Sequence, residues 1–498
     1  MDKFLETYLV AFVSTLFISR KVIKSIYSFI LISALVQYIH FNYYGTWIFP
    51  LEYLLFFTKF RETMQTFTTV LEITVAPIII ITLSAVLIFK LIDMMDKRRV
   101  GVPYLTVVLI FFLIFIPARV FIDDHSKKGA RPNMEVSPFI NTVETLGYFL
   151  GRVVPQKLSN SSGLEQSVTD MSPILRDRPD INIVVMMGES LTTKPMSLYG
   201  ANDATTPHLD KLKNDKNFLY QIAFASGVMT DISLPSFFNI TYQPDSTPQI
   251  ISTNSCLFKM AKLNGFETHF YSAQCRDGLS NVKSYMCTKW IDNYSDGTDT
   301  SGDIKIDAQD DVLLKQLNAI DLSKANFIVL HQVGSHTPFK LRYPEEFDIF
   351  EHHDGDRFDL SEYKNSILYT DHIISQVVQI LQQKSKKPTY LFFTSDHGEG
   401  IDEHSGHGHL EDQNQYEVPF IMYEINTDNT LEYELRNQTY TSHFEIAKLI
   451  AKSLGYDTSN LREYNGEHIV CGRDITGVAG YLKIKVEDDN ITALKVVD

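Results

Sequence analysis

The sequence predicts a helical membrane region followed by an α/β domain with a mainly parallel central sheet. Two observations support this prediction. Apolar residues dominate the chain from Phe4 to Ile122, whereas the chain beyond about Lys157 has the composition of a water-soluble protein. In that second part, short unbroken apolar runs alternate with stretches of helical pattern. Such runs are typical of strands in a sheet that is covered on both faces.

Several apolar segments are candidates for membrane spans. Phe67–Phe89 and Tyr104–Ile122 are the clearest, because a helix needs roughly 20 residues to cross the hydrocarbon of a bilayer. Val22–Ile39 is a third candidate, and Phe4–Ile18 is a shorter fourth. Trp47–Phe57 contains a proline and a glutamate, so we interpret it as an interfacial segment and not as a fifth span.

The positions of the basic residues predict the orientation of these helices. Clusters at Arg20–Lys24 and Lys97–Arg99 favour the cytoplasmic side. Placing both clusters inside gives a transmembrane domain of about four helices in residues 1–123, with the N-terminus and everything after Ile122 outside. No small-residue cleavage site follows the first apolar run, so we expect no cleaved signal peptide.

The rest of the chain divides into a linker and a soluble domain. Residues 124–180 are rich in proline and polar residues and predict a linker with interfacial helices, one of them near Ile140–Gly151. Residues 181–498 are predicted to form the soluble domain, and we expect this domain to end in a hairpin over Tyr481–Val497. Residues 1–158 carry a net charge of +5 and the remainder −20. Nucleic acid is therefore excluded as a partner, because no basic stripe exists to neutralise phosphates.

Three apolar runs predict neighbouring strands, and each is followed by polar residues. The runs are Ile181–Met187, Phe327–His331 and Tyr390–Phe393. Glu189 follows the first run, His336 the second, and Asp396 and His397 the third. Because the carboxyl ends of parallel strands form the binding crevice of an open sheet, we expect these side chains to converge on one rim.

The residues at this rim have the character of zinc ligands. Glu189, Asp396 and His397 offer the oxygen and nitrogen atoms that zinc prefers, and a tetrahedral site needs a fourth ligand. Thr230 follows a small, turn-prone segment, and metal coordination is one way to activate a hydroxyl as a nucleophile. One alternative is that Thr230 has only a structural role. Another is that Ser190 is the nucleophile, although its segment lacks the Gly-x-Ser-x-Gly pattern of serine nucleophiles.

Six segments resemble the phosphoethanolamine transferases of the alkaline-phosphatase/sulfatase superfamily, which modify lipid A or related surface glycolipids. The resemblance runs in order from about Ile181 to Tyr423. It rests on Met187–Ser190, Met196–Gly200, Thr205–Leu209, Thr230–Pro235, His331–Pro338 and Ser395–Glu399. It implies a sulfatase-like α/β domain of the alkaline-phosphatase type, carried by membrane helices.

The resemblance also implies roles for individual residues. The zinc ligands would be Glu189, Thr230, Asp396 and His397. Thr230 would in addition become transiently phosphorylated. His336 and His407 match histidines that hold the phosphoryl oxygens, or a second zinc ion, and assist proton transfer, so one zinc ion or two are expected. In the run His404–His409 only His407 is followed by glycine in the family's manner, and we expect His404 and His409 to face solvent.

The activity implied is zinc-dependent transfer of phosphoethanolamine from phosphatidylethanolamine to lipid A or another envelope glycan, through an intermediate on Thr230. The location implied is the bacterial inner membrane, multi-pass, with the catalytic domain in the periplasm. Phosphoglycerol transfer from phosphatidylglycerol is the close alternative. A sulfatase-like hydrolase is a weaker one, because Ser233–Phe237 lacks the arginine of the sulfatase motif. An alternative from a different class is a membrane protein without catalytic activity that binds lipid or organises the envelope. Such a scaffold would carry no stoichiometric metal, so the zinc content of the purified protein distinguishes it from an enzyme.

The four cysteines all lie in the soluble part of the chain. In an oxidising compartment, Cys275 and Cys287 are the best candidates for a local disulfide. Members of the family commonly flank the nucleophile with two disulfide-bonded cysteines, and here Ser226 and Ser236 stand in those neighbourhoods. This difference leaves the acceptor open and does not affect the catalytic chemistry.

Overall fold

The computed structural model describes two compact units, residues 1–163 and 164–498, and each is considered by itself. The described residues are 20–44, 47–48, 50, 52–53, 56, 71–94, 115, 118–120, 122, 137–155, 174–175 and 178–496, the last range with gaps at 243, 245–248, 251–252, 280–281, 283–285, 352–359, 402–405, 428–438, 464, 474–479 and 488–489.

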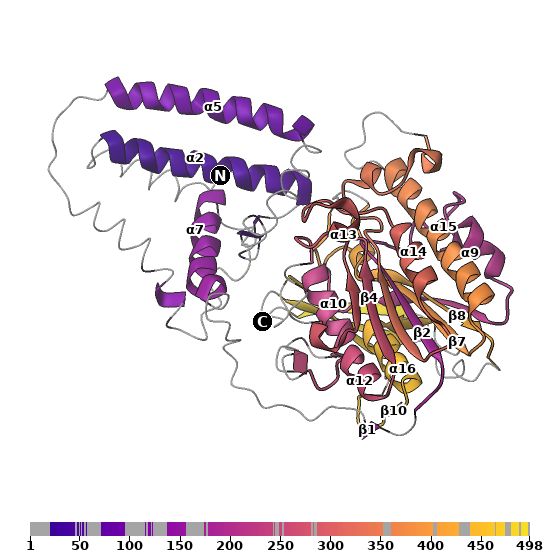
Figure 1. The fold of residues 1–498 in the computed structure, drawn as a ribbon. Coiled ribbons are helices and arrows are strands. Elements are labelled where there is room, and N and C mark those ends of the chain that lie inside the picture. The colour runs from indigo at the N-terminus through magenta and orange to yellow at the C-terminus, as the bar shows by residue number, and fades with distance from the viewer. Residues whose placement is uncertain are drawn as a thin grey trace. The chain divides into compact units, whose positions relative to one another are not determined.

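Two long helices form most of the described N-terminal unit (Figure 1). They are α2 (Arg20–Tyr44) and α5 (Leu71–Met94), and Lys24 Nζ on α2 donates to Asp93 Oδ2 on α5 at 2.8 Å. Within them, residues 20–42 and 74–94 are long and apolar enough to cross a membrane by length and composition.

These two helices correspond to two of the predicted spans. Val22–Ile39 lies within α2, and α5 covers Phe67–Phe89 from residue 71 onward. Phe4–Ile18 lies outside the described residues, as does most of Tyr104–Ile122, and Trp47–Phe57 is described only in part.

The helix predicted near Ile140–Gly151 is α7 (Pro138–Tyr148), continued by the π-helical turn Phe149–Val153. The side chain of Ser137 caps α7 by accepting from the backbone N–H of Ile140. Proline suits the first helical position because the N–H that it lacks would have no partner within the helix. Gln37 of α2 donates to Thr142 Oγ1 at 2.9 Å, which fixes α7 to α2.

The C-terminal unit is built on an eight-stranded sheet of order β5-β4-β6-β2-β7-β8-β3-β9. Its strands are β2 (Asn182–Gly188), β3 (Phe218–Phe224), β4 (Glu267–Ser272), β5 (Asn293–Ser295), β6 (Asn326–His331), β7 (Thr389–Ser395), β8 (Glu417–Ile425) and β9 (Tyr440–Ser442). Every pair is parallel except those that β8 makes with β7 and β3. The mainly parallel sheet is confirmed, and the three predicted strands are the neighbours β6, β2 and β7.

Helices cover both faces of this sheet (Figure 1). One core contains residues of α10 (Thr230–Phe238), α12 (Leu257–Leu263) and α16 (His443–Ser453). The other contains residues of α9 (Pro207–Leu212), α14 (Val312–Ala319) and α15 (Leu360–Lys384). Successive residues of β2 alternate between the two cores, which explains why the strand is apolar at almost every position.

The remaining described elements are small. The chain ends in a three-stranded antiparallel sheet of β11 (Glu467–Cys471), β12 (Tyr481–Glu487) and β13 (Asn490–Val496). β12 and β13 confirm the predicted C-terminal hairpin. A two-stranded pair joins β1 (Ile174–Leu175) to β10 (Tyr456–Asp457), and α13 (Gly297–Ser301) is a single turn.

The expected disulfide between Cys275 and Cys287 was wrong. Cys287 is bonded to Cys256, and Cys275 is a buried free thiol. Cys256 lies at the start of α12, which the fold places beside the segment around Cys287, although 31 residues separate the two in sequence. Cys275 instead follows β4, where its backbone N–H donates to Asp307 Oδ1. Proximity in sequence was a poor guide to the pairing, because tertiary packing decides which thiols meet.

Candidate active site

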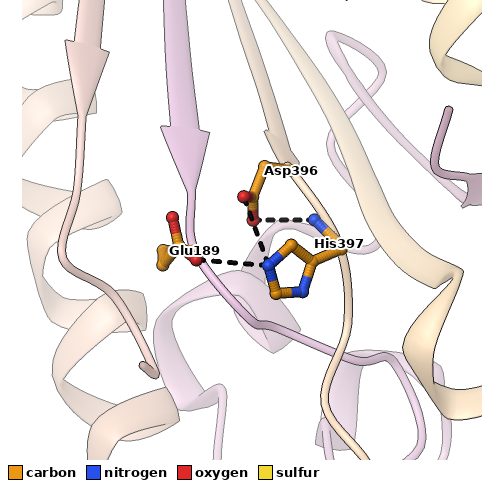
Figure 2. A group of neighbouring side chains, drawn as sticks. All are labelled: Glu189, Asp396 and His397. Atoms are coloured by element: carbon orange, nitrogen blue, oxygen red, sulfur yellow. Dashed lines mark hydrogen bonds and ion pairs between the residues drawn. The ribbon is translucent and has the colours of Figure 1, made fainter. Parts of the chain in front are cut away.

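The carboxyl ends of β2 and β7 bring Glu189, Asp396 and His397 together (Figure 2). The two strands pair in parallel with Gly188 opposite Ser395, so the residues that follow are neighbours. One ligand atom from each of the three side chains lies within 4.8 Å of the others, and all three side chains are buried. His397 Nε2 is 3.3 Å from Glu189 Oε1 and 3.5 Å from Asp396 Oδ2.

The hydrogen bonds around these groups leave ligand atoms free for a cation. His397 Nδ1 donates to the carbonyl of Gly398 at 2.8 Å, which directs Nε2 at the two carboxylates. Asp396 Oδ1 accepts from the backbone N–H groups of Ser190 and His397. Asp396 Oδ2 accepts no hydrogen bond from the described residues. A buried carboxylate oxygen in this state is costly, and a metal ion would satisfy it.

The pKa values of the three groups indicate that the two buried carboxylates favour a positive charge beside them. Burial raises the pKa of Asp396 to about 7, and the nearby Glu189 carboxylate adds to this. Burial acts to lower the pKa of His397, but the charges of Asp396 and Glu189 outweigh it and raise that pKa to about 10. Burial acts to raise the pKa of Glu189, but the hydrogen bond and charge of His397 hold it well below its usual value. Two buried carboxylates beside one imidazole are thus a fitting ligand set for a divalent cation.

Thr230, the first residue of α10, reaches the same point. Its Oγ1 donates to Glu189 Oε1 at 3.0 Å and lies 3.2 Å from His397 Nε2. Because α10 begins at Thr230, the positive end of the helix dipole lies at this hydroxyl. Thr230 is partly exposed, whereas the competing hydroxyl of Ser190 is fully buried. The geometry therefore favours Thr230 as the hydroxyl that a substrate meets.

Residues from neighbouring strands hold Glu189 in place. Gln274, two residues beyond β4, donates from Nε2 to Glu189 Oε2 at 2.8 Å. The backbone N–H of Ser335 donates to the Glu189 carbonyl at 2.9 Å. His331 ends β6 with Nε2 3.9 Å from Glu189 Oε2, and burial lowers the pKa of this imidazole to about 4. The sequence reasoning missed Gln274. The signal that could have found it is its place just beyond a strand that ends at the same edge of the sheet.

His336 and His407 lie beside the three candidate ligands. Their ring centroids are 5.8 Å apart, and the ring of His407 is 4.6 Å from that of His397. His407 Nδ1 is 3.6 Å from Glu399 Oε2, and burial lowers the pKa of His407 despite this carboxylate. Arg342 donates from Nε to the carbonyl of His336 at 2.7 Å, which fixes the loop after β6. All six predicted site residues are therefore found in one place.

The other two histidines of the run 404–409 differ from His407. His404 lies outside the described residues. His409 is buried, so the expectation that it faces solvent was wrong. Arg473, which follows β11, accounts for this burial: its Nε donates to the carbonyl of Gly408, and its Nη2 lies 3.1 Å from His409 Nε2.

Comparison with known proteins identifies the family of this domain. A family model described as Sulfatase matches residues 181–456. The chain is 27% identical to phosphoethanolamine transferase EptA of Helicobacter pylori over 259 residues, which cover 48% of this chain and 47% of that protein. It is 25% identical to the Kdo(2)-lipid A phosphoethanolamine 7''-transferase of Escherichia coli over 345 residues, which cover 64% of this chain and 59% of that protein. The match to the Helicobacter pylori protein thus spans about half the length of each chain.

Solved structures show the same fold. The integral membrane lipooligosaccharide phosphoethanolamine transferase A of Neisseria meningitidis aligns with a TM-score of 0.60 and 17% identity, covering 93% of this chain and 90% of that one. The structure of its soluble domain aligns with a TM-score of 0.50 and 19% identity, covering 60% of this chain and 96% of that one. With the family model matching more than half of its length, this chain belongs to the sulfatase family.

Proposed function

We propose that this protein transfers phosphoethanolamine from phosphatidylethanolamine to lipid A or another cell-envelope glycan, with zinc as cofactor and Thr230 as nucleophile. The observation that carries the proposal is the convergence of the Thr230 hydroxyl on Glu189 Oε1 and His397 Nε2, at 3.0 and 3.2 Å. The names of the relatives support phosphoethanolamine as the transferred group.

The residues fit a zinc ion held by Glu189, Thr230, Asp396 and His397. The fit rests on the Asp396 oxygen that accepts no hydrogen bond from the described residues and on the fixed direction of His397 Nε2. When bound, zinc supplies the positive charge that polarises the phosphoryl group and lowers the pKa of a coordinated hydroxyl. His336 and His407 would contact the phosphoryl oxygens, or hold a second zinc ion.

The reaction proceeds in two displacements. In the first, Thr230 Oγ1 forms a bond to the phosphorus of the lipid and the bond to diacylglycerol breaks. The proton of the threonine hydroxyl goes to the departing diacylglycerol oxygen. In the second, an acceptor hydroxyl or phosphate oxygen attacks the phosphorus, the bond from phosphorus to Thr230 Oγ1 breaks, and the threonine oxygen takes up a proton, which an attacking hydroxyl releases. His336 and His407 lie close enough to the site to stabilise charge on the phosphoryl oxygens and to carry these protons.

The proposed activity assigns a role to each part of the chain. Residues 1–123 would form the transmembrane domain, residues 124–180 the linker, and residues 181–498 the periplasmic catalytic domain. The helices would keep the catalytic domain at the membrane surface, where the lipid donor resides. A bacterial inner membrane with the catalytic domain on its periplasmic side is the location that suits these substrates.

Lipid turnover by the full chain in vesicles tests this proposal. Vesicles containing phosphatidylethanolamine and phosphatidylglycerol in equal amounts are supplied with a lipid A acceptor, and diacylglycerol and the modified acceptor are measured. The expected result is consumption of phosphatidylethanolamine that stops after chelation and returns with zinc. Consumption of phosphatidylglycerol instead would make the protein a phosphoglycerol transferase. Free headgroup with an unmodified acceptor would make it a hydrolase.

A further inference from the structure

The active site is assembled from elements that lie apart along the chain, so something must set the distance between them. Asp396 and His397 follow β7, whereas Thr230 begins α10, which follows β3 two strands away in the sheet. The antiparallel strand β8 separates β7 from β3. A residue that joins α10 to the end of β7 would therefore control where the threonine hydroxyl lies.

His443, the first residue of α16, makes this connection. Its Nε2 lies 2.9 Å from the carbonyl oxygen of Ser395, the residue before Asp396. Its Nδ1 lies 3.1 Å from the backbone nitrogen of Ser226, in the loop that leads to Thr230. The imidazole is fully buried.

The tautomer of His443 follows from these partners. A backbone N–H only donates, so Nδ1 accepts from Ser226 and carries no proton. A carbonyl only accepts, so Nε2 carries the proton and donates it to Ser395. Burial lowers the pKa of His443 to about 3, which keeps the imidazole neutral at physiological pH. A neutral, buried ring with both nitrogens bound to backbone groups is suited to holding structure and not to carrying protons.

Two further contacts join the same ring to α10 itself. Ser233, one turn after Thr230, donates its hydroxyl proton to the carbonyl of Asp396 at 2.5 Å, and its Oγ packs 3.1 Å from His443 Nδ1. The ring of Phe237 meets the imidazole edge-on, with centroids 5.2 Å apart. Ser226 is thus hydrogen-bonded through His443 to the residue before Asp396, while Ser233 and Phe237 of α10 pack against the same ring.

We propose that His443 is a positioning residue that holds α10, and with it the hydroxyl of Thr230, against Asp396 and His397. This inference rests on the proposed function, in which Thr230 is the nucleophile. A displacement of about 1 Å at a reacting atom costs roughly 100-fold in rate. Without the imidazole, the zinc ligands of β2 and β7 keep their places and the nucleophile loses its alignment.

The test compares four variants of the full chain in phosphatidylethanolamine vesicles. They are His443→Leu, His443→Asn, His443→Gln and the control His269→Leu. An asparagine oxygen replaces Nδ1 as the acceptor for Ser226, and a glutamine nitrogen replaces Nε2 as the donor to Ser395. His269 is a matched control because it is also a buried histidine whose two nitrogens are hydrogen-bonded, to Tyr271 and Asn326 on β4 and β6.

The measurements are the rate at which phosphoethanolamine mass appears on Thr230 at saturating zinc, the zinc affinity, and the unfolding temperature. His443→Leu is expected to slow adduct formation by roughly 100-fold, with zinc affinity within a few-fold of wild type. The asparagine and glutamine variants should fall between leucine and wild type, because each keeps one hydrogen bond. His269→Leu should lower the unfolding temperature and leave the rate unchanged.

The inference is overturned if His443→Leu forms the adduct at the wild-type rate, or if His269→Leu slows it equally. If the leucine variant does not fold, rates within twofold of wild type in both amide variants overturn it. Failure of the proposed function looks different, because wild type itself would then carry no adduct on Thr230.

Discussion

The two sides of the active site are built in different ways. On one side, Glu189, Asp396 and His397 follow directly from adjacent parallel strands, so the sheet itself places them. On the other side, Thr230 stands at the start of α10, two strands away, and reaches the same point through contacts that involve the loop after β3, α10 and α16.

The positions of the strand-end residues follow from the local sequence pattern, whereas the position of Thr230 depends on tertiary packing. Strand ends in a parallel sheet share an edge, so polar residues after buried strands meet wherever the strands are neighbours. A residue on a helix has no such constraint. Its position depends on every contact that orients the helix. For α10 these include the packing of Ser233 against His443 and the hydrogen bond of Ser226, in the preceding loop, to the same ring.

The largest effect expected on the nucleophile side comes from Thr230→Ala. Removal of the attacking oxygen should reduce phosphoethanolamine transfer on the order of 10⁴-fold, because the proposed covalent intermediate forms on this oxygen. Transfer is measured by turnover of labelled lipid. Ser190→Ala is the matched control, since its hydroxyl lies 3.3 Å from the same Glu189 oxygen and should matter far less. Equal losses in both variants would remove the distinction between the two hydroxyls.

On the strand side, Asp396→Asn should abolish most metal binding. The amide removes a negative charge from a buried ligand set, and zinc affinity should fall on the order of 10³-fold if four ligands share the binding free energy. Equilibrium competition with a chelating dye measures this. Asp371→Asn is the control, because Asp371 is also buried and accepts from two backbone N–H groups, those of His208 and Leu209, outside the site. Zinc affinity that survives Asp396→Asn would contradict the assignment of this ligand.

A smaller effect is expected from Gln274→Leu. The variant frees Glu189 Oε2 from its hydrogen bond, and residues that orient metal ligands contribute roughly 10- to 100-fold in affinity. The measurement is again zinc competition, together with the unfolding temperature with and without zinc. Gln382→Leu, which breaks a hydrogen bond to Tyr423 on another part of the domain, should leave zinc affinity unchanged. If both variants bind zinc like wild type, Gln274 has no role in holding Glu189.

The smallest effect concerns the loop that carries His336. Gly334 has φ +57°, and a Cβ there would meet the backbone N and O of Glu189 at 2.8 Å. Gly334→Ala should lower the free energy of unfolding by about 1–3 kcal/mol and weaken zinc binding several-fold by displacing Glu189. Gly302→Ala isolates the backbone cost, because Gly302 has φ +74° and open space around it. Zinc binding that is equally weakened in both variants would show that crowding of Glu189 plays no part.

The parts that the sequence predicted well are those set by local pattern. The central strands β6, β2 and β7 were expected, since runs such as Val184–Met187 are apolar on both sides of the strand. Their polar endings predicted the cluster of Glu189, Asp396 and His397. The C-terminal hairpin followed from two strand patterns around a polar turn.

The parts that it missed depend on contacts between distant segments. Cys287 pairs with Cys256 and not with Cys275, and His409 is buried under Arg473. Thr230 was singled out by the need for a fourth zinc ligand together with the family resemblance, because a hydroxyl after a turn-prone segment is ordinary by itself. His443 gave no signal at all, since a histidine at the start of a helix is ordinary until its partners are known.

Peptide mapping of the intact protein tests the central claim most directly. The full chain is incubated with phosphatidylethanolamine carrying an isotope-labelled headgroup, quenched before an acceptor is added, and digested for mass spectrometry. The account predicts labelled phosphoethanolamine on Thr230, formed only when zinc is present. The label on Ser190, or an adduct on Thr230 that forms equally well after zinc is removed, would contradict it.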